Sequence, residues 1–285
     1  MNPSTHALQV GARRGWLEFR HGLADPQDLG FYLVMGSGLF WYMFVNRDDV
    51  VEGTASLLMP TVFMPSVLGG LVAFGGVISV AYALAAERED GTLLRAKAIP
   101  HGMSGYLVGH VVRTSLETFP ALAVVLVPGL FVFDDLMSGG AGGWVTFSWV
   151  LALGLVASIP IGMIIGGLVK RPSKVGTWGM LPIIGLVSIS GIFYPITALP
   201  DWIQTLAQVF PIYWLGLGMR SAFLPDSAAA WEIGESWRTL ETVGVLGLWA
   251  VAGVLLAPIV LRRIARRESG SLLEARREKA MQRIN

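Results

Sequence analysis

Between two long apolar stretches lies one strongly charged island, Glu87-Arg88-Glu89-Asp90-Gly91-Thr92-Leu93-Leu94-Arg95-Ala96-Lys97-Ala98-Ile99-Pro100. It predicts a short polar helix, because acidic residues fill the first turn and basic residues the last, as the helix dipole favours, and a proline ends it. Two leucines and Ile99 would give this helix an apolar side that could lie in a groove on a partner protein. The apolar flanks place the helix at the face of a membrane.

The composition is that of a membrane protein. Of the 285 residues, 53% are hydrophobic and only 14% charged, and the mean hydropathy of +0.60 is too high for a soluble domain of this size. The sequence has no cysteine, which excludes a disulfide framework and a thiolate metal site. We expect no metal and no organic cofactor on this chain. The polar amino terminus lacks the apolar core of a cleavable signal, so we expect the first spanning helix to be retained.

Six apolar stretches can serve as membrane spans, each of which takes about 20 residues. They are residues 29–45, 57–86, 103–133, 144–169, 175–196 and 239–261. We therefore predict an all-α integral membrane protein that forms a single domain over residues 1–285, with a six-helix bundle at 29–261. Residues 11–25 predict an interfacial helix, because apolar residues recur there at helical spacing among arginines. Residues 262–285 predict a charged cytosolic tail.

The distribution of basic residues predicts the orientation, because Lys and Arg are retained on the cytoplasmic side. With both termini in the cytoplasm, only Arg47, Arg220 and Arg238 of the 21 basic residues lie outside. We predict a multi-pass protein of the bacterial plasma (inner) membrane. The excess of Arg over Lys is a minor indication of a GC-rich bacterial genome. Aromatic residues of the kind that anchor helices at the outer interface agree with this orientation: Trp41, Tyr42, Trp144, Phe193, Tyr194, Trp202 and Trp214.

A proline-rich segment follows the fifth apolar stretch. The residues between Pro200 and Pro211 are too few to cross a bilayer, so they predict a re-entrant helical hairpin in the outer leaflet. Such a segment is stable only when it is buried in protein or lines a cavity. The candidate residues of an outer gate are Phe193, Tyr194, Pro195, Pro200, Trp202, Phe210 and Pro211.

Arg113 and Glu117 lie one helical turn apart in the third apolar stretch, where their side chains can meet. Charged residues inside a membrane often mark a functional site. The alternative, which we favour, is that Arg113 reaches the inner interface and pairs with Glu117 for a structural purpose. Gly102-Met103-Ser104-Gly105 matches an intramembrane serine protease pattern, but the four histidines lie at cytosolic or inner-face positions, so we treat the match as coincidence.

Several motifs occur together in a fixed order. They are Glu87-x-Glu89-x-Gly91-Thr92, Ser190-Gly191-Ile192-Phe193-Tyr194-Pro195, Leu199-Pro200-x-Trp202 and Phe210-Pro211. With the six spans and the interfacial helix, they resemble the membrane subunit of type-2 (ABC-2) ABC exporters, and among these the drug-resistance permeases typified by daunorubicin exporters. The resemblance covers nearly the whole chain.

The resemblance implies a dimeric permease, built with a second copy or a paralogous permease. It implies a separate cytosolic ABC ATPase dimer that holds ATP and Mg. The outer-gate residues named above would form its gate helices. The resemblance also implies that the charged island is a coupling helix to the ATPase, carried by Glu87, Glu89, Asp90, Gly91, Thr92, Leu93, Arg95 and Ile99. The alternative for this island is an ordinary solvated loop.

The sequence carries no nucleotide site of its own, because no Gly-Lys pair, and hence no phosphate-binding loop, occurs in it. We therefore expect a transporter subunit and not an enzyme, with membrane lipids around it and no nucleic-acid partner. The hypothesis is an ATP-driven exporter of an amphiphilic drug, natural product or lipid that works by alternating access. The alternatives are a glycan exporter of the same architecture, a proton-coupled secondary transporter, and a membrane scaffold.

Overall fold

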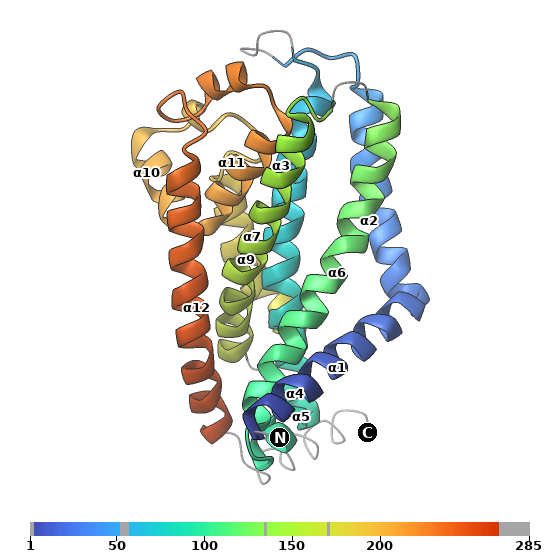
Figure 1. The fold of residues 1–285 in the computed structure, drawn as a ribbon, viewed down its shortest axis with the longest axis vertical. Coiled ribbons are helices and arrows are strands. Elements are labelled where there is room, and N and C mark those ends of the chain that lie inside the picture. Colours follow the sequence, from blue (N-terminus) through green and yellow to red (C-terminus); the bar gives the residue numbers. More distant parts are fainter. Residues whose placement is uncertain (1–2, 52–56, 134–135, 170–171, 268–285) are drawn as a thin grey trace.

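The computed structural model describes residues 3–51, 57–133, 136–169 and 172–267. Within these ranges the regular structure is helical, and β pairing is limited to one bridge between Val50 and Leu58. Figure 1 shows long helices that run between two ends of a bundle. We call the end with residues 90–102 the basal end, and the end with residues 46–51 and 224–238 the apical end.

The long helices begin with α1 (Pro3–Ala24) and α2 (Pro26–Val45), which meet at a bend of 70°. The bend follows from the sequence, because Asp25 caps α2 by accepting a hydrogen bond from Gln27 N at 2.8 Å and Pro26 occupies the first turn. The remaining elements are α3 (Met59–Phe74), the π-helix η1 (Gly75–Ser79), α4 (Val80–Asp90), α5 (Thr92–Ala98), α6 (Gly102–Val132), α7 (Gly140–Leu168), α8 (Pro172–Lys174), the π-helix η2 (Val175–Gly179), α9 (Met180–Ser188), the 3₁₀ helix η3 (Ile196–Ala198), α10 (Asp201–Val209), α11 (Pro211–Phe223), the 3₁₀ helix η4 (Asp226–Trp231) and α12 (Thr239–Arg267).

The prediction of an all-α membrane protein is confirmed, whereas the number of crossings stays a prediction. Among the residues that the structure describes, four helical segments are long and apolar enough to span a membrane: Met59–Asp90, Gly102–Val132, Gly140–Leu168 and Thr239–Leu261. The bent pair of α1 and α2 would supply a fifth. The predicted span 175–196 is helical only as far as Ser188, which gives a length of roughly 21 Å against the ~30 Å of a hydrocarbon core.

The helix predicted over the charged island is split in two. Gly91 adopts the left-handed conformation, with φ of 84°, and ends α4 before α5 begins at Thr92. The expectation that acidic residues occupy the first turn is therefore wrong, because Glu87, Glu89 and Asp90 lie at the end of α4. The end of α5 agrees with expectation, since Ile99 is extended, as the residue before a proline prefers to be.

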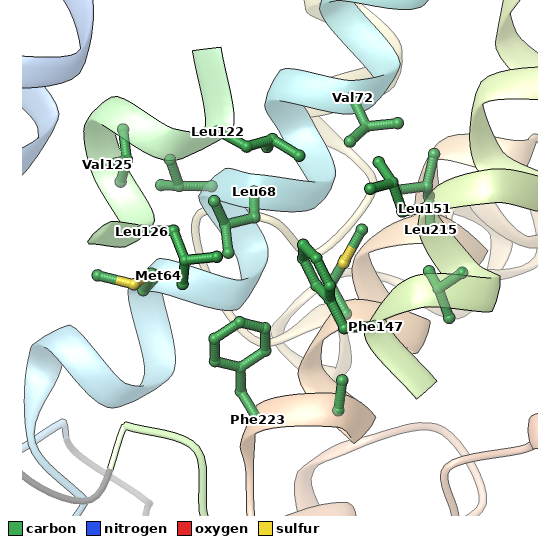
Figure 2. Close-up of a cluster of buried hydrophobic side chains, with 14 of the residues drawn as sticks. Met64, Leu68, Val72, Leu122, Val125, Leu126, Phe147, Leu151, Leu215 and Phe223 are labelled. Carbon is green, nitrogen blue, oxygen red and sulfur yellow. The ribbon is translucent and has the colours of Figure 1, made fainter. Parts of the chain in front are cut away.

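The centre of the apical half is α11, which is buried along almost its whole length. Figure 2 shows Leu215 and Phe223 of α11 among side chains of α3, α6 and α7. The members of this core include Met64, Leu68, Val72, Leu122, Val125, Leu126, Phe147, Leu151, Leu215 and Phe223. At Gly69 of α3, an added Cβ would lie 3.1 Å from the Gly216 Cα, so the two helices approach closely at these glycines. The fold thus holds the short helix α11 against three longer ones, α3, α7 and α12.

Candidate functional site

The charged island is attached to the bundle through Glu87, whose side chain is 13% exposed. Its Oε1 accepts a hydrogen bond from Arg14 Nη2 at 2.5 Å, and its Oε2 lies 2.9 Å from His110 Nε2. Arg14 also pairs with Glu18 at 2.6 Å. The end of α4 is thereby joined to both α1 and α6.

The next residue, Arg88, points to a different helix. Its buried guanidinium donates through Nη1 to the carbonyl oxygens of Gly167, at 2.7 Å, and Val169, at 3.0 Å. These carbonyls lie at the carboxyl end of α7, where backbone acceptors have no partner within the helix and a cation is favoured by the dipole. Arg88 therefore caps α7, a role that its place in a run of charges did not reveal.

Leu93 of α5 is fully buried. Contrary to the expectation from the sequence, its side chain therefore offers no apolar surface to a partner. It belongs to a core cluster with Leu84 of α4, Met163 of α7 and Leu261 of α12. Gly91 is buried as well, and Thr92 is half-buried. The inward side of the island thus contacts the main helices of the basal half.

The outward side of the island consists of Glu89, Asp90, Arg95, Lys97 and Ile99, which are all exposed. Asp90 accepts a hydrogen bond from the Thr92 amide at 2.8 Å, which orders the turn between α4 and α5. We call these five residues the basal face. The segment therefore has one side built into the bundle and one side that is charged and accessible.

The α1 helix crosses α6 at a contact between glycines that sequence reasoning missed (Figure 1). A Cβ added to Gly11 would lie 2.1 Å from the Gly105 oxygen, and one added to Gly15 would lie 2.4 Å from the Gly109 oxygen. Both helices carry a Gly-x-x-x-Gly spacing, which permits such close backbone contact. That paired spacing was the signal that could have placed α1 against α6.

Arg113 and Glu117 are paired, with Nε and Oε1 2.6 Å apart. Arg113 Nη1 also lies 3.7 Å from Glu18 Oε2, which extends the charged network from α1 along α6. Both Arg113 and Glu117 line a cavity of about 780 Å³. The pair therefore borders this cavity, and Arg113 also connects α6 to α1 through Glu18.

The candidate gate residues divide into two groups. Phe193, Tyr194, Pro195, Pro200 and Trp202 are exposed, whereas Phe210 is half-buried and Pro211 is buried at the start of α11. Phe210 stacks on Trp249 of α12 with ring centroids 6.3 Å apart, and Trp249 Nε1 donates to the Val209 oxygen at 2.9 Å. Trp214, expected in the outer aromatic belt, is instead 2% exposed within the bundle.

Arg220 of α11 connects the apical segments and was not singled out from the sequence. Its Nε lies 2.5 Å from Glu232 Oε1, and both side chains are buried. Its Nη1 donates to the oxygen of Gly191 at 3.0 Å and to Ser66 Oγ at 3.3 Å. A buried arginine requires such partners, so this one residue fixes three segments around α11.

Residues 42–258 match the model of a family described as "ABC-2 family transporter protein". Two curated relatives are the "Probable multidrug ABC transporter permease YbhR" of Escherichia coli K12 and that of Escherichia coli O157:H7. Each is 21% identical over 189 residues, which make up 66% of this chain and 50% of the relative. The match thus spans about half the length of these relatives.

Proposed function

Because this chain belongs to the ABC-2 family of transporter proteins, we propose that it is the permease subunit of an ATP-driven exporter. It would work with a separate ABC ATPase, which holds ATP and Mg, and with a second permease subunit. Its cargo would be an amphiphilic drug, natural product or lipid. The name of the Escherichia coli relatives, a multidrug permease, supports a drug-like cargo.

The observation that carries this proposal is the two-sided construction of the charged island. Its basal face is accessible to a partner, while Glu87, Arg88 and Leu93 on its other side contact α1, α6, α7 and α12. A displacement of the basal face by a bound partner would therefore be transmitted to all four of these helices. In this mechanism, nucleotide binding draws two ATPase subunits together and shifts the permease between two arrangements of its helices.

The orientation that suits this mechanism places the basal end and both termini in the cytoplasm of a bacterium. The apical end, with the exposed gate residues, would then face outward. Among the alternatives, a proton-coupled transporter would need an unpaired carboxylate at the midplane of the membrane. Glu117 is instead held by Arg113 at 2.6 Å, which favours the ATP-driven reading.

The proposal is tested by reversing charges on the basal face. The Glu89→Lys/Asp90→Lys double variant should uncouple ATP hydrolysis from transport of a fluorescent amphiphile in proteoliposomes that contain the copurifying ATPase. Asp48→Lys, an equally exposed reversal at the apical end, is the matched control and should transport normally. If the double variant inserted, folded and transported as well as the control, the coupling role would be refuted.

A further inference from the structure

The cavity beside Arg113 lies between α2, the continuous helix formed by α3, η1 and α4, and α6. One side is closed by Pro172, Ser173, Val175 and Gly176. Its volume of about 780 Å³ is within the range of roughly 300–1,000 Å³ that is usual for small-molecule sites. Phe31 and Tyr82 line it and are more than half exposed, so the cavity opens to the side of the subunit.

The lining changes character along the cavity. Toward the basal end it includes Gln27, Glu87 and Arg113, whereas further along the helices it includes Met35 and Leu71. A ligand with a polar head and an apolar body would match this arrangement.

The aromatic lining favours a cation over an anion. Phe31, Tyr32, Phe74 and Tyr82 contribute four rings, two from α2 and two from the α3–α4 helix. The faces of such rings attract a positive charge, and the attraction increases when the cation leaves water.

The charged groups around the cavity also favour a cationic ligand. The network contains two guanidinium groups, on Arg14 and Arg113, and three carboxylates, on Glu18, Glu87 and Glu117. Of these groups, Glu87, Glu117 and Arg113 line the cavity itself, so its lining carries two carboxylates and one guanidinium. A cation beside these carboxylates would be stabilised, because charges attract more strongly in a protein interior than in water.

Both π-helical segments of the described chain contribute to this wall. Gly75 and Ser79 belong to η1, and Val175 and Gly176 belong to η2. A π-helix is rare and occurs frequently at functional sites, because its wider turn displaces side chains from their regular positions. Their presence on two sides of one cavity marks it as a built feature of the fold.

From this geometry we infer that the cavity is a binding site for a cationic amphiphile, with the charged head beside Glu117 and the apolar body among the aromatic rings. That such a ligand is also the cargo rests on the function proposed above. The binding itself does not, since every residue that lines the cavity belongs to this chain.

The test is equilibrium binding of two probes of the same shape and opposite charge, tetraphenylphosphonium and tetraphenylborate, to the full chain in nanodiscs without nucleotide. Empty nanodiscs supply the background. We expect saturable binding of the phosphonium, and Glu117→Gln should weaken it about tenfold while tightening binding of the borate. Tyr82→Ala should weaken the phosphonium because a ring is lost. Glu241→Gln, an exposed carboxylate change on α12, should alter neither.

Opposite shifts for the two probes cannot result from misfolding, which would abolish both. If Glu117→Gln did abolish both, Arg113→Gln would decide: tighter phosphonium binding would support the inference, and unchanged or weaker binding would overturn it. Absence of saturable phosphonium binding to the unaltered chain, with coupling to the ATPase intact, would overturn this inference alone. Saturable binding together with unaffected export in the Glu89→Lys/Asp90→Lys variant would overturn only the proposed function.

Discussion

Replacing Arg88 by Met should destabilise the whole subunit, although this residue stands in a run of charges at the end of the bundle. The substitution keeps a long side chain but removes the donor to the Gly167 and Val169 oxygens. A hydrogen bond from a charged group contributes roughly 1.5–3 kcal/mol, and a cation at a helix carboxyl end up to ~2 kcal/mol. Since methionine restores some apolar contact, we expect a net loss of about 3 kcal/mol, or roughly a hundredfold in the folding equilibrium.

The measurement is reversible unfolding in mixed micelles, followed by the fluorescence of the ten tryptophans. Arg95→Met is the matched control, because Arg95 is exposed and its Nη2 donates only locally, to Thr92 Oγ1 at 2.8 Å. The control should change the free energy of unfolding by no more than about 0.5 kcal/mol. A loss for Arg88→Met as small as that of the control would show that the α7 cap is not a stabilising interaction.

Three further outcomes are expected. Gly105→Leu should separate α1 from α6, because even a Cβ at Gly105 would lie 2.7 Å from a backbone oxygen of α1. The rate of amide hydrogen exchange in α1 should then rise, and an unchanged rate would contradict this contact. Arg220→Met should lower the free energy of unfolding by about 3–5 kcal/mol, because it leaves the buried Glu232 without its ionic partner. Adding Glu232→Leu should recover most of this loss, and simple additivity of the two changes in a double-mutant cycle would disprove the pairing. Cysteine at Trp202 should react with a polar maleimide differently with and without trapped nucleotide, whereas cysteine at buried Ala207 should stay unreactive; identical labelling at Trp202 in both states would remove its gating role.

The long helices could be predicted from the sequence because their signal is local. Residues 103–133 and 144–169 were expected as spans, and α6 (Gly102–Val132) and α7 (Gly140–Leu168) end within a few residues of those limits. Apolar length alone determines such elements, since a chain in lipid must satisfy its backbone hydrogen bonds within the helix.

The sequence-based predictions were wrong where contacts between distant segments determine the role of a residue. Nothing local distinguishes Arg88, which caps another helix, from Arg95, which faces solvent. Leu93 appeared available to a partner only because its neighbours on α7 and α12 are distant in sequence. The sequence therefore placed the candidate site in one short segment, and the role of that segment stays a prediction, whereas the division of its residues into an inner and an outer side required the fold.

The short helix α11 has a consequence for biosynthesis. Its thirteen residues cannot span a bilayer, and Arg220 would be costly in contact with lipid tails. During biosynthesis, α11 can therefore pack into the bundle only after α3 and α7 have assembled. Insertion of the carboxyl-terminal third should lag behind its translation, and a ribosome stalled after Phe223 should leave a chain that cellular proteases recognise as incomplete.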